Sequence, residues 1–545
     1  MCKRVVSTGD TPLPTDNLTC AAARHSTMSQ LISLSVSLPS VSPSHWFETV
    51  GTQRAPSEAE AGDIRNVISD ANLSLSEVEH SIDRIQEALN LFYQRRGEIS
   101  EHIDVHKALL SPVRHLPNEI LAEIFINCLP LISKKDGKLS SFCRRQAPLL
   151  VCQVCSRWRA IALSTQKLWS LIQVEFGMTT VRNDVPCMSI WLERSGTHPL
   201  SFVLRERIEV LSFAGVSILD TILPFSDRWQ HLEIYCHRDT LHGLSPIRDR
   251  LPLLQSISVS VFGGHEGSSW DAFELAPSLR SVDLGSGTQI SYFKFPSAHL
   301  VEFCSHDATL CPAEGLEFLR HCPNLISCTF RDLLDQPIQP STPPLQHCRL
   351  LNLSMSPESN LGGFFDCLTL PALRSVRLDP LASPVFQEMG WPGSQFLDLL
   401  ERSSCTLKKF TWALNSVRIE DIVRCLEYMP DLEVLEITPN LSYSLPELLH
   451  SLTPRAPGEG KSLCPKLLVV QLSVDHTLNQ EALNAFVKSR WSAEVIPGAV
   501  PIRSIRLFPT FLPWQPEKVL RHLKEFQDEG LDVSVCDSDG SWGRF

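Results

Sequence analysis

One pair of cysteines has a spacing that could support metal binding or redox chemistry. Cys152 and Cys155 have the Cys-x-x-Cys spacing that is typical of redox pairs and of half a zinc site. No second Cys-x-x-Cys supplies the remaining two ligands, and the pair lies in a segment with helical periodicity. We therefore predict that both thiols pack in a core, and that the chain binds no metal and no cofactor.

Two further patterns bear on catalysis. Gly460-Lys461-Ser462 is similar to the end of a phosphate-binding loop, but Arg455 stands where that loop needs its first glycine, and no apolar strand precedes it. The sequence lacks a Gly-x-Ser-x-Gly elbow and a His-Glu-x-x-His helix. We predict that the chain is not an enzyme. A catalytic triad that assembles only in space is the alternative that spacing leaves open.

The composition excludes several classes of partner. The 545 residues carry 49 Lys+Arg against 61 Asp+Glu, a formal charge of -12 that gives no attraction toward phosphate backbones. No window reaches the roughly 18 apolar residues of a membrane span, and residues 1–27 contain no apolar core of a secretion signal. We expect an intracellular protein, cytoplasmic or nuclear, with reduced thiols and without nucleic acid or membrane as partner.

The elements that must position any site begin after a polar stretch. Residues 1–60 hold 17 Ser or Thr and 5 Pro, which predicts disorder because little surface can be buried. A long amphipathic or coiled-coil helix over 72–110 follows, because apolar residues recur at alternating steps of four and three from Val78 to Ile103. This helix packs on its neighbouring domain or pairs with a second copy through residues 78–103. Arg96 and Gly97 in the seam weaken the case for the homodimer.

Residues 111–172 read as two short amphipathic helices joined by a polar loop. Pro117 suits the first turn of a helix, and Ile120, Leu121, Ile124 and Phe125 then recur at helical spacing. A second helix is predicted from about Pro148. Two helices of this size cannot form a stable core alone, so part of their aliphatic face should dock on a partner.

This segment resembles an F-box motif. The resemblance rests on Leu116-Pro117-Asn118-Glu119-Ile120-Leu121 with Ile124-Phe125, on Cys155-Ser156-Arg157-Trp158-Arg159, and on Leu168-Trp169. More narrowly, it is similar to fungal F-box-like proteins in which a heptad helix enters the motif through a Ser-Pro-x-Arg step, here Ser111–Arg114. The loop from Leu131 to Gln146 is longer than in the common F-box.

The resemblance implies a helical hook that binds a Skp-type linker protein, and through it a cullin-based ubiquitin ligase. We predict that Leu168 and Trp169 close the motif internally. The expected docking face consists of ten residues: Leu116, Pro117, Ile120, Leu121, Ile124, Phe125, Leu150, Val151, Cys155 and Trp158. For any one of these, packing within the chain's own core is the alternative.

A repeating unit fills the rest of the chain. Its form is aliphatic-x-x-aliphatic-x-aliphatic, with a common interval near 25 residues and some of 34 or 35. The first positions of the units are Trp229, Leu254, Leu279, Leu300, Leu325, Cys348, Leu373, Leu407, Leu432, Leu467 and Ile502. This period predicts an α/β fold, a leucine-rich-repeat-like solenoid over 185–535, with 536–545 as a tail.

The residue between the last two aliphatic positions of each unit should point outward onto the concave sheet. The candidate target-binding residues at this position are Asp283, Arg377, Thr411, Glu436, Gln471 and Arg506. Their mixed charge favours a protein or peptide target over an anionic polymer. The alternative is that they are ordinary solvated strand positions.

Two functions remain open on these observations. The first is a substrate-receptor, or adaptor, subunit of a Skp-cullin-F-box ubiquitin ligase, whose repeats bind an unknown target protein. Such a subunit performs no chemistry itself and acts by raising the target's effective concentration near the transferring enzyme. The second is a leucine-rich-repeat interaction scaffold that has no link to ubiquitination.

Overall fold

A computed structural model gives the fold of the chain. It describes residues 39–40, 44–50, 52, 54–130, 141–177, 181–207, 214–263, 269–306, 310–333, 337–339, 342–357, 361–379, 392–413, 418–438, 445–455, 461–474, 479–491, 499–509, 516–536 and 542–544. The predicted disorder over 1–38, the first ten residues of the polar loop (131–140) and Gly460 lie outside these ranges. The chain forms two compact units, Met1–Pro117 and Asn118–Phe545.

The first unit contains the long helix. Helix α3 runs from Glu58 to Leu109, after a single turn α2 (Phe47–Val50) and before the 3₁₀ turn η1 (Pro112–His115). It begins well before the predicted residue 72, because Ser57 and Glu60 form a capping box that satisfies backbone N–H groups of the first turn. Residues 58–60, which composition assigned to a disordered segment, are therefore helical.

The apolar stripe of α3 is exposed along most of its length. Ile82, Ile85, Leu89, Phe92, Ile99 and Ile103 each have between 43% and 53% of their surface open. A helix with an open aliphatic stripe is stabilised less by tertiary packing than one whose stripe is covered.

The second unit begins with the predicted helical pair. Helix α4 spans Asn118–Asn127, and the second element is split into the 3₁₀ turn η2 (Val151–Gln153), helix α5 (Ser156–Ser164) and the 3₁₀ turn η3 (Gln166–Trp169). The prediction of one continuous helix from about Pro148 is wrong. Cys155 adopts an extended conformation (φ −160°, ψ 172°), and its sulfur accepts the Trp158 N–H, so this residue caps a new helix.

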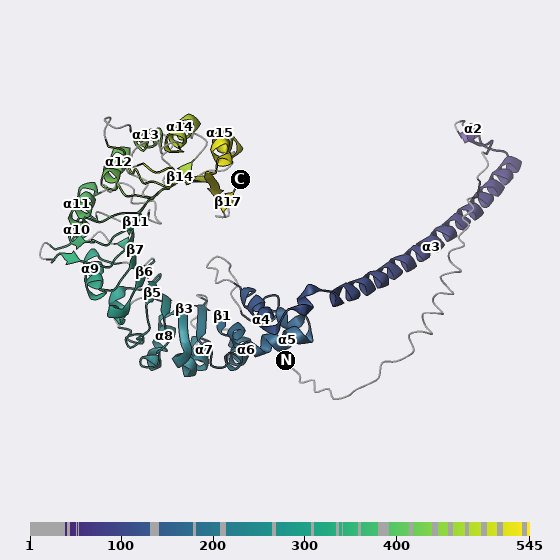
Figure 1. The fold of residues 1–545 in the computed structure, drawn as a ribbon. Coiled ribbons are helices and arrows are strands. Elements are labelled where there is room, and N and C mark those ends of the chain that lie inside the picture. Colours follow the sequence, from purple (N-terminus) through teal and green to yellow (C-terminus); the bar gives the residue numbers. More distant parts are fainter. Residues whose placement is uncertain are drawn as a thin grey trace. The chain divides into compact units, whose positions relative to one another are not determined.

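A large, almost wholly parallel sheet forms the rest of the second unit (Figure 1). Neighbouring strands follow chain order, and among the described pairings of this sheet only the last, between β16 and β17, is antiparallel. The strands are β1 (Leu171–Phe176), β2 (Leu200–Glu206), β3 (Trp229–His237), β4 (Ser256–Phe262), β5 (Ser281–Leu284), β6 (Glu302–Ser305), β7 (Ser327–Leu333), β9 (Asn352–Pro357), β11 (Ser375–Leu378), β12 (Lys409–Trp412), β13 (Val434–Ile437), β14 (Val469–Val474), β15 (Ser504–Pro509), β16 (Asp532–Cys536) and β17 (Trp542–Arg544). Strands β8 (Leu345–Gln346) and β10 (Leu368–Thr369) form a separate small pair.

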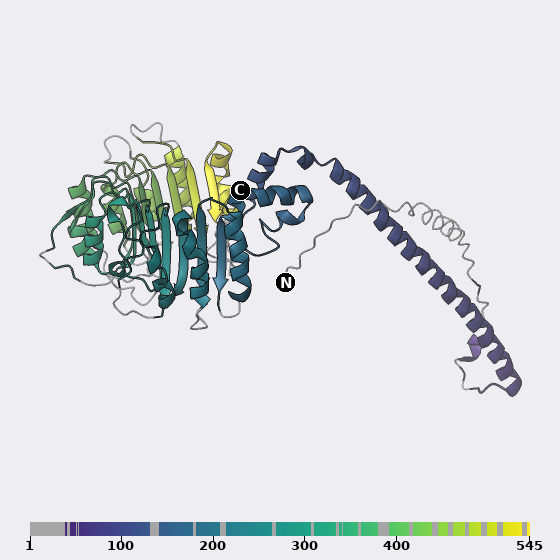
Figure 2. The same ribbon diagram turned by 90° about the horizontal axis from the view of Figure 1, so that it is seen from below.

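The connections between strands carry the helices, which cover one face of the sheet. Figures 1 and 2 show the strands lining the inner, concave side of a curved sheet and the helices on its outer side. These helices are α6 (Val181–Arg194), α7 (Ala214–Ile222), α8 (Arg238–His242), α9 (Pro312–His321), α10 (Gly362–Asp366), α11 (Gly393–Ser403), α12 (Ile419–Glu427), α13 (Leu445–Ser451), α14 (Gln480–Trp491) and α15 (Pro516–Asp528). The chain is thus a mixed α/β protein with a long N-terminal helix, as predicted at that level.

The aliphatic units coincide with the strands. In nine of the eleven units the strand begins two residues after the predicted first position, as in Leu254 before β4. The unit assigned to Cys348 is out of register, because Leu350 is buried at the equivalent position while Cys348 is exposed. The outward residue of that strand is therefore Ser354, which pairs with Thr329, and not Asn352.

Both ends of the sheet extend beyond the predicted repeats. Strand β1 follows η3 directly, and Ser141, which precedes the helical pair's second element, bonds the β1 backbone: its N–H donates to the Gln173 carbonyl (2.9 Å) and its Oγ accepts the Gln173 N–H (2.8 Å). At the other end, residues predicted as a tail form β17. Among the described residues, no helix is both long and apolar enough to cross a membrane.

Candidate protein-docking surfaces

The interior of the helical pair uses three of the ten predicted docking residues. Leu121, Phe125 and Val151 are buried, and the Phe125 ring lies against Trp158 with centroids 4.8 Å apart. Side chains that are covered in this way hold the two helices together. In this structure they cannot offer contact atoms to a partner.

The open part of the predicted face is aliphatic. Ile120 and Ile124 of α4 are 48% and 41% exposed, and their i, i+4 spacing places them on one side of the helix. Leu150 is 48% exposed at the start of η2. Val154, which is not among the ten predicted docking residues, is 56% exposed. We call these four residues the exposed aliphatic set.

The other four predicted docking residues differ in their exposure. Pro117 and Cys155 are exposed, whereas Leu116 and Trp158 are half-buried. Of the ten predicted residues, the aliphatic side chains that remain well exposed are Ile120, Ile124 and Leu150.

Polar contacts fix the two helices in place. The Arg157 guanidinium donates to Oδ1 of Asn118, at 2.9 Å from Nη2 and 3.2 Å from Nε, and so links α5 to the start of α4. Arg159 Nε donates to the Cys152 carbonyl at 2.9 Å. These hydrogen bonds join α5 to α4 and to η2, the elements that carry or flank the exposed aliphatic set.

The end of the motif is buried within the chain, as predicted, and it also contacts helix α6. Leu168 and Trp169 are fully buried, and the Trp169 indole N–H donates to the Ala162 carbonyl at 2.8 Å. The other side of Trp169 meets Trp191 of α6, with centroids 4.8 Å apart, and the Arg194 guanidinium lies 4.5 Å from its ring. No linker separates the helical pair from the sheet.

The Cys152-x-x-Cys155 pair differs in part from its predicted role. Burial raises the pKa of the half-buried Cys152 thiol, which disfavours the reactive thiolate. Cys155 is exposed and caps α5, so it does not pack in a core as predicted. Every cysteine that the structure describes with a side chain is free of disulfide bonds.

The six predicted target-binding residues lie in one continuous row across the sheet. Each is paired in register with the outward residue of the neighbouring strand. In order from β4 to β16, the row is Ser258, Asp283, Cys304, Thr329, Ser354, Arg377, Thr411, Glu436, Gln471, Arg506 and Ser534. We call it the concave row. Its members from Arg377 to Arg506 occupy five adjacent strands.

The centre of the concave row is an internal polar network. The Glu436 carboxylate accepts a hydrogen bond from the buried Thr411 hydroxyl (2.8 Å) and forms an ion pair with the Lys409 ammonium group (2.6 Å). The Arg377 guanidinium lies 3.9 Å from the same carboxylate. Arg377 also bonds Asp379 at 2.8 Å, and this bond, with the nearby carboxylates, raises the pKa of its guanidinium. Arg377 keeps nearly half of its side chain exposed, so it is both oriented and accessible.

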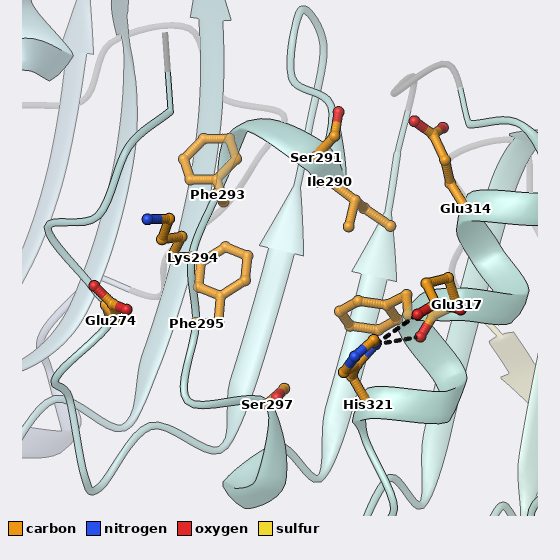
Figure 3. A pocket seen from close by; sticks show the side chains of 11 residues that line it. Glu274, Ile290, Ser291, Phe293, Lys294, Phe295, Ser297, Glu314, Glu317 and His321 are labelled. Atoms are coloured by element: carbon orange, nitrogen blue, oxygen red, sulfur yellow. Dashed lines mark hydrogen bonds and ion pairs between the residues drawn. The ribbon is translucent and has the colours of Figure 1, made fainter.

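A groove of about 410 Å³ lies between the Ile290–Ser297 segment and α9 (Figure 3). Phe293 and Phe295 form its apolar wall, stacked with centroids 5.5 Å apart. His321 and Glu317, which Figure 3 shows joined by dashed lines, lie on the same helix. Its lining also includes the charged residues Glu274, Lys294 and Glu314.

Comparison with known proteins gives no family. No family model matches the chain, and no curated protein matches it. Among solved structures, a crystal structure of a protein from Bacteroides fragilis has 11% identity and a TM-score of 0.31, and the match covers 62% of this chain and 86% of that one. A TM-score of that size carries no argument about fold or function.

Proposed function

We propose that this chain is the substrate-receptor subunit of a Skp-cullin-F-box type ubiquitin ligase. The helical pair acts as the F-box and docks on the Skp-type linker, while the curved sheet is a leucine-rich-repeat-like solenoid that holds the target protein. The order of motifs in residues 111–172 and the near-25-residue aliphatic period support this assignment.

One observation supports the docking role most strongly. The exposed aliphatic set leaves four branched side chains about half open to water, on or beside elements that hydrogen bonds join to one another. Covering one such side chain contributes roughly 1.5–3 kcal/mol at full burial, and about half of each surface remains to be covered here. Exposed aliphatic side chains gathered in one short motif are typical of a protein-docking site.

A direct binding experiment tests the proposal. Purified full-length chain, mixed with a Skp-type linker protein and passed over a sizing column, should elute with the linker as a stoichiometric complex. The complex should then recruit a cullin. If circular dichroism shows that the chain is folded and it still does not bind the linker, the result favours an interaction scaffold without a link to ubiquitination.

The concave row supplies the proposed target-binding surface, which gives a separate prediction. Replacing both Arg377 and Arg506 with Glu reverses two charges on the row without touching the helical pair. We expect linker binding to remain unchanged and target degradation to fail. The measurement is the set of proteins that accumulate when the chain is removed from cells: wild type should restore their turnover, and the variant should not.

A matched control uses charge reversal elsewhere on the same unit. Arg250 is an exposed residue outside the concave row. The Arg250→Glu variant should restore turnover as wild type does. Equal rescue by the Arg377, Arg506 double variant would show that targets bind elsewhere.

We further propose that α3 pairs with a second copy of itself through residues 78–103. The stripe is self-complementary in a coiled coil, because its steps of four and three keep the same residues at the seam of both helices. Arg96 replaces one apolar seam position and lowers the expected affinity, and Gly97 weakens the helix beside it.

The homodimer gives a measurable prediction. Replacing Ile85 and Leu89 with Glu puts four like charges in the seam and should convert a dimer to a monomer by light scattering, a loss of affinity on the order of 100-fold or more. Leu91 and Val105, equally apolar and exposed but outside the heptad positions, provide the control when replaced with Glu. A monomeric wild-type chain at micromolar concentration would contradict the pairing.

A further inference from the structure

Three chemically distinct side chains converge on the concave row. Asp283 of β5 and Cys304 of β6 are register partners, and His306 follows Cys304 by two residues, which returns it to the same face of the sheet. The backbone N–H of His306 donates to the Leu284 carbonyl at 2.6 Å, which fixes the His306 backbone against β5. The three potential ligand atoms all lie within 4.8 Å of one another.

The arrangement differs from that of a catalytic triad. The same nitrogen, His306 Nε2, lies 3.0 Å from Cys304 Sγ and 3.7 Å from Asp283 Oδ1. In a nucleophile–base–orienter triad, the two nitrogens of the imidazole contact different partners. Convergence of sulfur, nitrogen and oxygen on one point is instead the geometry of ligands around an ion.

The distances suit a small tetrahedral ion. Ligand atoms about 2.0–2.3 Å from a zinc ion lie about 3.3–3.6 Å from one another in a tetrahedron. The nitrogen–oxygen distance of 3.7 Å is close to this range, and the sulfur–nitrogen distance of 3.0 Å requires a shift of about half an ångström. The Ser258 hydroxyl donates to Asp283 Oδ2 at 3.2 Å, which orients the carboxylate with Oδ1 toward the histidine.

We propose that Asp283, Cys304 and His306 bind a Zn²⁺ ion. A thiolate with an imidazole selects zinc over magnesium or calcium, which prefer oxygen ligands throughout. Binding releases the thiol proton to solvent, and no redox step takes place. Three protein ligands leave a fourth position for water or for a group of a bound molecule, because Asp283 and His306 remain partly exposed. The site does not depend on the proposed ligase role.

Cobalt titration tests the site, because a thiolate–Co²⁺ bond produces its own absorption band. Full-length protein, kept reduced by a phosphine, should show this band at one equivalent of Co²⁺ and lose it when Zn²⁺ is added. Cys304→Ser should abolish the band. His306→Gln should weaken metal affinity at least about tenfold. Cys348→Ser, at an exposed cysteine outside the site, should leave the absorption band and the metal affinity unchanged.

Thermal unfolding provides the second readout. Without metal, wild type and Cys304→Ser should melt alike, which shows that the variant is folded, and Zn²⁺ should raise the midpoint of wild type only. Two results would overturn the proposal: no thiolate–cobalt band in the wild-type chain, or a band of the same affinity in the Cys304→Ser variant. Asp283→Asn repeats the comparison with an isosteric side chain if the serine variant does not fold.

Discussion

Replacing Ile120 and Ile124 with Asp should abolish binding of the Skp-type linker while the chain remains folded. Both side chains are more than two-fifths exposed, and the change leaves the buried Leu121, Phe125 and Val151 of the helical pair in place. In the proposed complex both would be covered, and two carboxylates would then be buried without partners. Each unpaired buried charge costs several kcal/mol, so we expect affinity to fall by at least about 100-fold. Titration calorimetry with the purified linker measures the change.

The control for this variant is a pair of aliphatic residues with the same exposure elsewhere. Leu253 and Leu275 are 44% and 53% exposed in the sheet connections. Their replacement with Asp adds the same charge and should leave linker affinity unchanged. If the Ile120, Ile124 variant binds the linker as tightly as wild type, α4 does not carry the docking surface, and the receptor assignment loses its main support.

Replacing Arg490 with Met should destabilise the second unit by about 3–5 kcal/mol, because three buried carbonyl groups lose their donors at a cost of about 1–3 kcal/mol each. The Arg490 side chain is fully buried, and its guanidinium donates to the carbonyls of Leu452, Leu463 and Cys464 at 2.5–3.0 Å. Burial lowers the pKa of this guanidinium to about 10, which leaves it protonated at neutral pH. Methionine fills similar space but leaves three carbonyl groups without donors.

Two further variants separate the effect of hydrogen bonding from that of charge. Arg490→Lys keeps the charge but loses the planar fork, and should recover only part of the stability. Lys488→Met, at an exposed position of the same helix α14, should change the free energy of unfolding by less than about 0.5 kcal/mol. Urea unfolding gives all three values, and equal midpoints for wild type and Arg490→Met would show that solvent replaces the lost donors.

Period and register explain why much of the sheet could be predicted from sequence. Side chains alternate between the two faces of a strand, so the aliphatic triplets alone identify the strands and the residues of the opposite face, although Thr411 and Glu436 are themselves buried. That is why Arg377, Thr411 and Glu436 could be selected before their register was known. The unit at Cys348 failed because two overlapping triplets, one starting at Cys348 and one at Leu350, fit the pattern, and only burial selects Leu350.

The sequence determined the long N-terminal helix, the first helix of the pair, the strands of most repeat units and the residues that carry the F-box-like and repeat patterns, because these depend on local spacing. Tertiary structure alone decided which members of the helical pair are open. Periodicity marks an apolar side without saying which neighbour covers it, so Phe125 and Ile124 look alike in sequence. Likewise, Asp283 and His306 are far apart in the chain, and only the pairing of β5 with β6 brings their ligand atoms together.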